Sequence, residues 1–282
     1  MKWVACVMVM ATVAAAAPAK TDIAWSFKTG GDDAPDAVKF GFDSRGVNPT
    51  PKAWSDAYRE RTDIAELVDP TIATAADGGA AWVATSVKRA HQCRGPSGTW
   101  AQCKEFATPT INALVLYAKA GTKWNPVAIH AGVPVSDQDL AKRVATGMKL
   151  GAVPSQVDAS AKDAVALFQT SFADPQQLAA SVSDRKDVAL FGSAPNEKTV
   201  GGGAVAKKLG GWKLAFTVHD GVAAGTVGSI AWVAANVDAR PAGKADAKPT
   251  PYRVMCLYEK MKTWKLVAVE FSFVAPDQAP ED

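Results

Sequence analysis

The chain has few of the residues that most often carry metal, redox or nucleophilic chemistry. Only three histidines and four cysteines occur among its 282 residues, with no His-x-x-x-His, Glu-His or Cys-x-x-Cys spacing. A Gly-Lys-Ser/Thr phosphate loop and a Gly-x-Ser-x-Gly nucleophile turn are also missing. Metal, nucleotide and acyl-transfer sites are most readily recognised by these patterns, so the sequence predicts no metal site and no cofactor.

An excess of one charge is also missing, because 31 Lys and Arg are balanced by 28 Asp and Glu for a net charge of +3. The basic residues are spread along the chain, so we expect no nucleic-acid partner. Hydrophobic residues make up 48% and charged residues 21%, as in ordinary globular proteins. These proportions exclude a disordered, collagen-like or multi-span membrane chain, and the length suits one large domain or two ordinary ones.

Residues 1–19 have the features of a secretory signal peptide. Lys2 is followed by about a dozen apolar residues and then by a run of small residues with an Ala-x-Ala cleavage site. We expect cleavage after Ala19 and a secreted or periplasmic mature protein. The alternative is an uncleaved anchor, but the apolar stretch is shorter than the roughly 20 residues that span a bilayer. No later segment is apolar enough to span one.

Removal of the signal would leave three cysteines, an odd number for an oxidising compartment. Cys93 and Cys103 flank a turn-rich loop between two strand-like runs, so a disulfide that closes the tip of a hairpin is the simplest pairing. Cys256 lies in an alternating apolar run, which is more typical of a buried small hydrophobe than of a nucleophile.

The chain contains an internal repeat. Three short motifs occur twice in the same order: Ala-Trp-Val-Ala at 81–84 and 231–234, Trp-x-x-Val-Ala at 124–128 and 264–268, and Asp-Gln at 137–138 and 277–278. The spacing differs by ten residues, and the difference falls in the loop that carries the two cysteines. A duplication explains this order, so we divide the mature chain into residues 20–150 and 151–282.

The second half has patterns of both helices and strands. Apolar spacing predicts a helix over 161–172, and Asp174 followed by Pro175 predicts the capped start of a short helix that continues to 182. Next come a predicted strand at 188–191 and a short predicted helix at 204–209. Four further strands are predicted at 212–219, 229–237, 252–258 and 265–274. This order predicts an α+β fold and not alternating βαβ units.

These segments carry a resemblance to a known family. Gly-Ser-Ile-Ala-Trp-Val-Ala at 228–234 and Trp-Lys-Leu-Val-Ala-Val-Glu-Phe-Ser at 264–272 resemble the SnoaL-like group of the nuclear transport factor two superfamily. The resemblance implies two tandem cone-shaped domains, each a curved antiparallel sheet packed on helices. The first is divergent, and its leading helices are expected to be missing. Residues 136–148 are predicted to form a capped helix that closes the first cone.

The resemblance also implies how the two halves associate and where a pocket lies. Such cones pair sheet to sheet, so we expect an intramolecular pseudo-dimer. Their last strand often ends in His-x-Ser, and the matching positions here are His130-Ala131-Gly132 and Glu270-Phe271-Ser272. His130, Ser272 and Tyr252 are therefore candidate pocket residues.

Glu270 and His219 are the tentative catalytic residues. A carboxylate inside an apolar cone would have a raised pKa, as a general base at neutral pH requires, with His219 or Tyr252 as its partner. A strand glutamate on the outer, solvated face is the commoner case. His219 is followed by Asp220-Gly221, a common hairpin-turn dipeptide, so a turn is favoured over a His-Asp catalytic pair.

Three functional hypotheses follow. The first is an exported, non-enzymatic protein that binds a small apolar ligand or a protein partner. The second is a small-molecule isomerase, dehydratase or cyclase that uses Glu270 in the second cone. The third is a structural accessory protein of the cell envelope, for which we expect cones filled with aromatic side chains.

Overall fold

The computed structural model describes residues 17–18, 38–40, 47–48, 62–94, 100–102, 110–145 and 150–273. Nearly all of the predicted signal peptide, the region that precedes the first strand, and Cys103 lie outside these residues. The described part contains two sheets and several helices, which confirms the predicted α+β class.

The first sheet is formed by the first half of the chain. Its strand order is β2-β1-β7-β6-β4-β3, and β5 pairs with β4. All neighbours are antiparallel except β1 and β7, which are parallel. The strands are β1 (Val38–Phe40), β2 (Val47–Asn48), β3 (Thr62–Thr74), β4 (Ala80–Arg94), β5 (Trp100–Gln102), β6 (Ile111–Ala120) and β7 (Lys123–Gly132).

The second sheet is formed by the second half. Its order is β10-β9-β14-β13-β12-β11-β8, with β9 parallel to β14 and β8 parallel to β11. The strands are β8 (Gln156–Val157), β9 (Ala189–Phe191), β10 (Lys198–Val200), β11 (Leu214–Val227), β12 (Ile230–Pro241), β13 (Thr250–Lys260) and β14 (Trp264–Ser272).

The two sheets share six strands in the same order, and they also share their irregularities. The register of β3 on β4 shifts after Val68, and that of β11 on β12 shifts after Val218. A second shift follows Leu116 where β6 meets β7, and another follows Leu257 where β13 meets β14. Bulges bend a strand and increase its twist, so both sheets are bent at matching places, although the β11 bulge contains one residue more than the β3 bulge.

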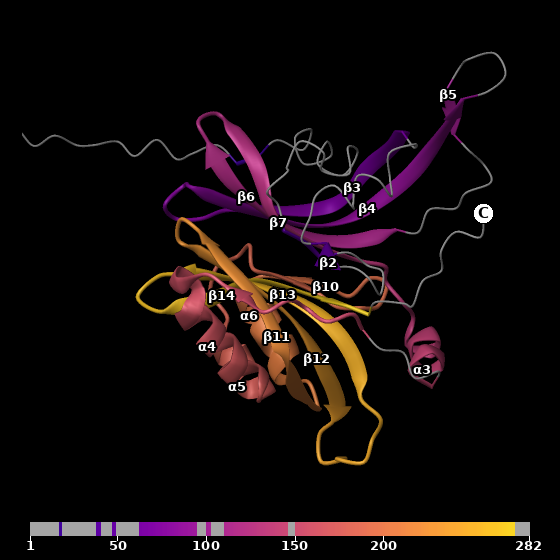
Figure 1. The fold of residues 1–282 in the computed structure, drawn as a ribbon, viewed down its shortest axis with the longest axis vertical. Helices are drawn as coiled ribbons and strands as arrows, with labels where there is room; N and C mark the ends of the chain where they lie inside the picture. The colour runs from indigo at the N-terminus through magenta and orange to yellow at the C-terminus, as the bar shows by residue number, and fades with distance from the viewer. Residues whose placement is uncertain are drawn as a thin grey trace, which may run out of the picture.

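Three helices cover the face of the second sheet that is turned away from the first sheet (Figure 1). A short 3-10 turn, Ala159–Ala161, leads into α4 (Lys162–Phe172), followed by α5 (Pro175–Ser181) and later by α6 (Gly202–Gly210). As predicted, the Asp174 side chain accepts a hydrogen bond from the Gln176 N–H, and Pro175 occupies the first turn of α5.

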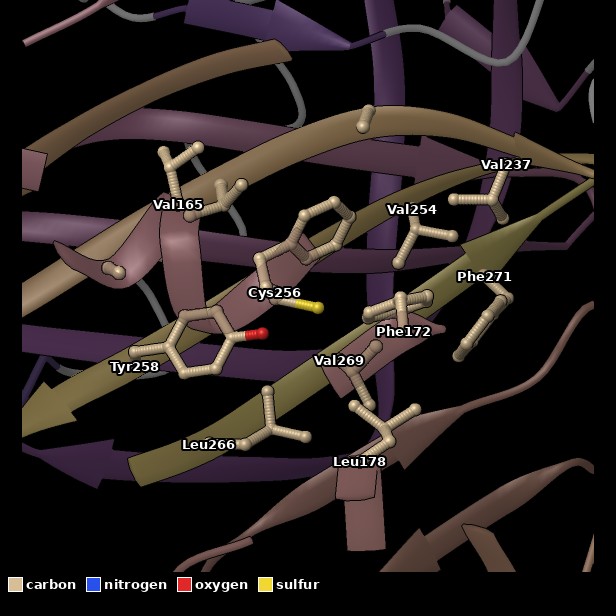
Figure 2. Packing of buried hydrophobic residues seen from close by; sticks show 14 of the residues in the cluster. Val165, Phe172, Leu178, Val237, Val254, Cys256, Tyr258, Leu266, Val269 and Phe271 are labelled. Carbon is tan, nitrogen blue, oxygen red and sulfur yellow. The ribbon is translucent and has the colours of Figure 1, made fainter. Parts of the chain in front are cut away.

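The concave side of the second sheet is filled by apolar side chains. Phe168 and Phe172 of α4 stack at a centroid distance of 4.4 Å, and Phe172 also contacts Phe216 and Phe271 from the sheet. Figure 2 shows Leu178 of α5 and several strand side chains packed in the same cluster. Aromatic side chains thus fill the space between the second sheet and its helices.

The other face of the second sheet packs against the first sheet, as the upper and lower sheets of Figure 1 show. Trp82 of β4 and Trp232 of β12, which occupy equivalent positions in the repeat, both belong to this interface. Many of their neighbours are alanines, including Ala84 and Ala234. Small side chains let the two sheets approach closely, and the interface excludes water from both tryptophans.

Residues at equivalent positions of the repeat meet each other in this interface. Gly132 at the end of β7 lies against Ser272 at the end of β14, and a Cβ atom on Gly132 would overlap the Cβ of Ser272. At the hairpin tips, the Asp77 carboxylate accepts a hydrogen bond of 2.6 Å from the Ser229 N–H. Contacts between like positions are typical of a two-fold arrangement.

Two predictions are corrected by the structure. Asp220-Gly221 is not a hairpin turn: β11 continues through it to Val227, and the dipeptide lies in the bulge between Val218 and Val222. Gly221 is needed there because a Cβ would overlap the Val153 carbonyl oxygen. The helix expected to close the first cone forms as α3 (Asp137–Ala145), but it lies beside the second sheet, where Lys248 Nζ donates to Ala145 O (Figure 1).

The close approach of β7 and β14 yields a stability prediction. Gly132→Ala forces a methyl group into Ser272 and should lower the free energy of unfolding by about 1–3 kcal/mol, measured by urea denaturation. Gly203→Ala is the control, because Gly203 lies in α6 and its Cβ would meet open space. This control should be neutral or slightly stabilising. A Gly132→Ala variant as stable as the control would contradict the packing described here.

Candidate functional site

A cluster of polar side chains is buried between the two sheets. His130 of β7 and Glu270 and Ser272 of β14 are each at most 1% exposed. His130 Nε2 lies 2.8 Å from Ser272 Oγ, within hydrogen-bond distance, and His130 Nδ1 lies 3.9 Å from Glu270 Oε2. The strands place them there because the alternation that puts Val269 and Phe271 on the helix side turns Glu270 and Ser272 toward the first sheet.

Arg253 extends this cluster along β13, where it pairs with Ser272 of β14. The Arg253 guanidinium is fully buried, donates from Nε to Asn236 Oδ1 at 3.1 Å and donates from Nη2 to Gly151 O at 2.8 Å. Asn236 Nδ2 donates to the same carbonyl at 2.8 Å. The charge of Arg253 is therefore held in a hydrogen-bonded frame, as a buried charge requires.

Burial decides the protonation of the other two titratable groups. Desolvation, together with the positive charge of Arg253, lowers the pKa of His130 from 6.5 to about 3. Desolvation raises the pKa of Glu270 well above its ordinary 4.5, and the nearby backbone of Leu114 offsets only part of that rise. A neutral imidazole therefore lies beside a carboxyl group that keeps its proton at pH values well above those at which a carboxyl group ordinarily ionises.

The structure brings three predicted site residues together, but between the sheets and not inside the second cone. Glu270, Ser272 and His130 line neither of the two grooves described below. Neither carboxyl oxygen of Glu270 has a hydrogen-bond partner among the described residues. The cluster is therefore part of the interface between the two sheets.

The predicted partners of Glu270 lie elsewhere. His219 is about half exposed on β11, where its Nε2 lies 3.3 Å from Asp238 Oδ1. Since β12 and β13 separate β11 from β14, His219 is roughly three strand spacings, about 14 Å, from Glu270. Tyr252 packs on the helix side of the sheet against Phe271 and Phe273, opposite to Glu270. The structure therefore does not assemble the base and partner of the enzymatic hypothesis.

The cysteines have separate environments. Cys256 is fully buried in the aromatic cluster on the helix side (Figure 2), and burial raises the pKa of its thiol far above the ordinary value. A thiol in this state is inert. Cys93 lies in β4, which pairs with β5 as a hairpin, but the predicted bond to Cys103 falls outside the described residues and stays a prediction.

An open groove of about 500 Å³ lies between α4, α5 and the hairpin that joins β13 to β14. We call it the lysine groove. Its lining includes Leu167, Thr170, Lys260, Lys262, Trp264 and Lys265. A volume of this size is in the range of small-molecule sites. No carboxylate contributes to the lining.

A second groove, of about 420 Å³, lies between the first sheet and the turn after β9. Its lining includes Val68, Lys88, Asn112, Pro134 and Asn196. The Ser86 hydroxyl donates to Asn112 Oδ1 at 2.8 Å, so part of its polar lining is already satisfied. It is less apolar than the lysine groove, with no aromatic side chain in its lining.

Two groups of important residues escaped the sequence reasoning. Arg185 donates to Glu259 and Asp187 and to the Thr74 carbonyl, and its guanidinium lies 4.9 Å from the Trp82 ring. It thus ties the loop after α5 to the first sheet, and no local pattern signals such a contact over 111 residues. The lysines of the groove had a signal, since three of them flank Trp264 within residues 260–265.

Two features are absent from the part of the chain that the structure describes. No group of three or more His, Cys, Asp or Glu side chains there is arranged to hold a metal ion. Among the described helices, none combines the length and the apolar character needed to cross a membrane.

The comparisons with known proteins concern the fold. No family model and no curated protein sequence matches the chain. Solved structures that resemble it include a candidate ketosteroid isomerase from Parabacteroides distasonis, with 19% identity, a TM-score of 0.34 and coverage of 42% of this chain and 88% of that one. A nuclear transport factor 2-like protein from Salmonella enterica has 17% identity, a TM-score of 0.33 and coverage of 42% and 91%.

A protein of unknown function with a cystatin-like fold from Nostoc punctiforme is similar at 14% identity and a TM-score of 0.33, with coverage of 44% of this chain and 98% of that one. Each of these matches spans less than half of this chain.

The buried pair predicts an unusual dependence of stability on pH. Below pH 6.5 the unfolded chain binds a proton at His130, whereas the folded protein does not bind it until about pH 3. Stability therefore falls as the solution is acidified. Above pH 4.5 the unfolded chain loses the Glu270 proton that the folded protein keeps, so stability also falls as pH rises. Between pH 4.5 and 6.5 the folded and unfolded states bind the same total number of protons at these two groups, so the two effects on the free energy of unfolding cancel.

Urea unfolding of wild type, Glu270→Gln and His130→Gln from pH 4 to pH 8 measures both effects. The difference between Glu270→Gln and wild type should shift in favour of the variant as the pH rises above 4.5, by at most about 1.4 kcal/mol per pH unit. His130→Gln should show the corresponding relative gain as the pH falls below 6.5. Variant-minus-wild-type differences that stay constant with pH would show that neither group titrates abnormally.

Proposed function

We propose that the protein is an exported, non-enzymatic binding protein made of two fused SnoaL-like units that pair through their sheets as an internal pseudo-dimer. The shared strand order, the repeated bulges and the contacts between equivalent residues support the duplication, with a boundary near residue 150. Export and the Cys93–Cys103 disulfide belong to this proposal on the sequence features described above.

The observation that carries the non-enzymatic proposal is the content of the second cone. Its concave side is occupied by Phe168, Phe172, Phe216, Phe271 and Tyr258, and the residues that would do acid-base work lie on the other face of the sheet. A substrate therefore has no room beside Glu270. An enzyme of the isomerase, dehydratase or cyclase type needs its carboxylate in the hollow, so this alternative loses its geometric basis.

Binding instead has a place outside the filled cone. The lysine groove combines an indole ring, apolar side chains and several charged groups in a concavity of small-molecule size. We therefore assign the ligand to this groove.

A structural role in the envelope is the second candidate, and one observation favours it. A filled cone is what a domain without any ligand would have, and the aromatic cluster of the second unit has this character. The two candidates differ in whether the lysine groove is used.

Native mass spectrometry distinguishes them. The mature protein purified from its own source should retain a bound small molecule, visible as added mass, and Trp264→Ala should lose it because the ring forms one wall of the groove. Trp212→Phe, which alters the aromatic cluster on the helix side of the sheet, is the control and should keep the added mass. A bare protein mass in wild type, together with no thermal shift in a broad ligand screen, would favour the structural role.

A further inference from the structure

We propose that the lysine groove selects a small organic anion with an apolar body. This inference rests on the proposed function, because it names the chemical class of ligand for the same groove. It departs from the apolar ligand expected from the sequence, and the charges and donors of the groove carry it.

The charge of the groove is one-sided. Lys260, Lys262 and Lys265 contribute to its lining, and no Asp or Glu does. The nearest compensation is Asp163, whose Oδ2 lies 3.8 Å from Lys260 Nζ but whose side chain is 80% exposed. The interaction energy of such an exposed ion pair is small, so Asp163 does not neutralise the positive potential of the groove.

Three of the four hydroxyl groups in the lining already donate hydrogen bonds within the protein. Thr170 donates to Ala166 O, Ser171 to Phe168 O and Ser181 to Leu178 O, all within their own helices. Lys265 Nζ donates one hydrogen bond to Ala180 O at 3.2 Å. Lys262 has no ion-pair partner among the described residues. The remaining donors include the Thr263 hydroxyl, the Gln177 amide and the lysine ammonium groups. The ammonium groups are the charged ones, and they fit a ligand that accepts hydrogen bonds and carries negative charge.

The apolar part of the groove centres on Trp264. Its ring is covered on one side by Lys260 at 4.9 Å, and its indole nitrogen is shielded from solvent without a hydrogen-bond acceptor in the described structure. An anion whose flat apolar body lies near the indole would meet both the ring and the lysines.

Two fluorescent probes separate charge from apolar contact. The anionic probe 1-anilinonaphthalene-8-sulfonate and the neutral N-phenyl-1-naphthylamine share one aromatic skeleton and differ in the sulfonate. We expect the anionic probe to bind more tightly to wild type and to weaken with added salt, because exposed ammonium groups are screened. Lys262→Gln/Lys265→Gln should weaken the anionic probe about three- to tenfold and change the neutral probe less than twofold.

Lys207→Gln/Lys208→Gln is the matched control, since it removes the same charge from α6, outside the groove lining. It should leave the affinity for both probes unchanged. Equal affinity of wild type for the two probes, or equal weakening in the control, would overturn the anion inference. If both probes bind equally and Trp264→Ala abolishes both, the groove binds apolar molecules, and only the proposed binding function survives. If neither probe binds, both proposals fail.

Discussion

Burial of one face of each sheet against the other is the constraint on which the rest of this structure depends. An antiparallel sheet with an apolar face must cover it, and here each sheet covers the other with rows of alanine and a tryptophan. The helices α4, α5 and α6 are then needed only on the far side of the second sheet. The layers are therefore first sheet, second sheet and helices, and every candidate site is defined by its place in this stack.

The contacts between equivalent positions explain why the two halves differ where they do. In a symmetric pair, the same side chain would face its own copy at positions 130 and 270 and again at positions 132 and 272. Two buried glutamates would repel each other once ionised, and two serines would clash. The chain has His130 opposite Glu270 and Gly132 opposite Ser272 instead, which removes both conflicts. If the chain arose by the proposed duplication, this asymmetry is permitted because each half is encoded separately.

Much of the fold could be predicted from the sequence because its signals are local or repeated. The start of α5 followed from Asp174 and Pro175, and the buried state of Cys256 from its alternating apolar run. The surroundings of Glu270 could not be predicted in this way. Alternation correctly separated its face from that of Phe271, but which face meets helices and which meets the other sheet depends on contacts between residues more than 100 positions apart. Arg185 and α3 were missed or misplaced for the same reason.

Histidine-selective NMR tests the face-to-face pairing most directly, because His130 is one of only three histidines in the chain. In a protein with labelled imidazole rings, the account predicts nuclear Overhauser contacts between the His130 ring and the side-chain protons of Ser272, which lies 142 residues away. It also predicts a His130 resonance that stays that of a neutral ring at pH 5. A His130 ring that titrates near pH 6.5 and shows no contact with β14 would contradict the pairing of the two sheets.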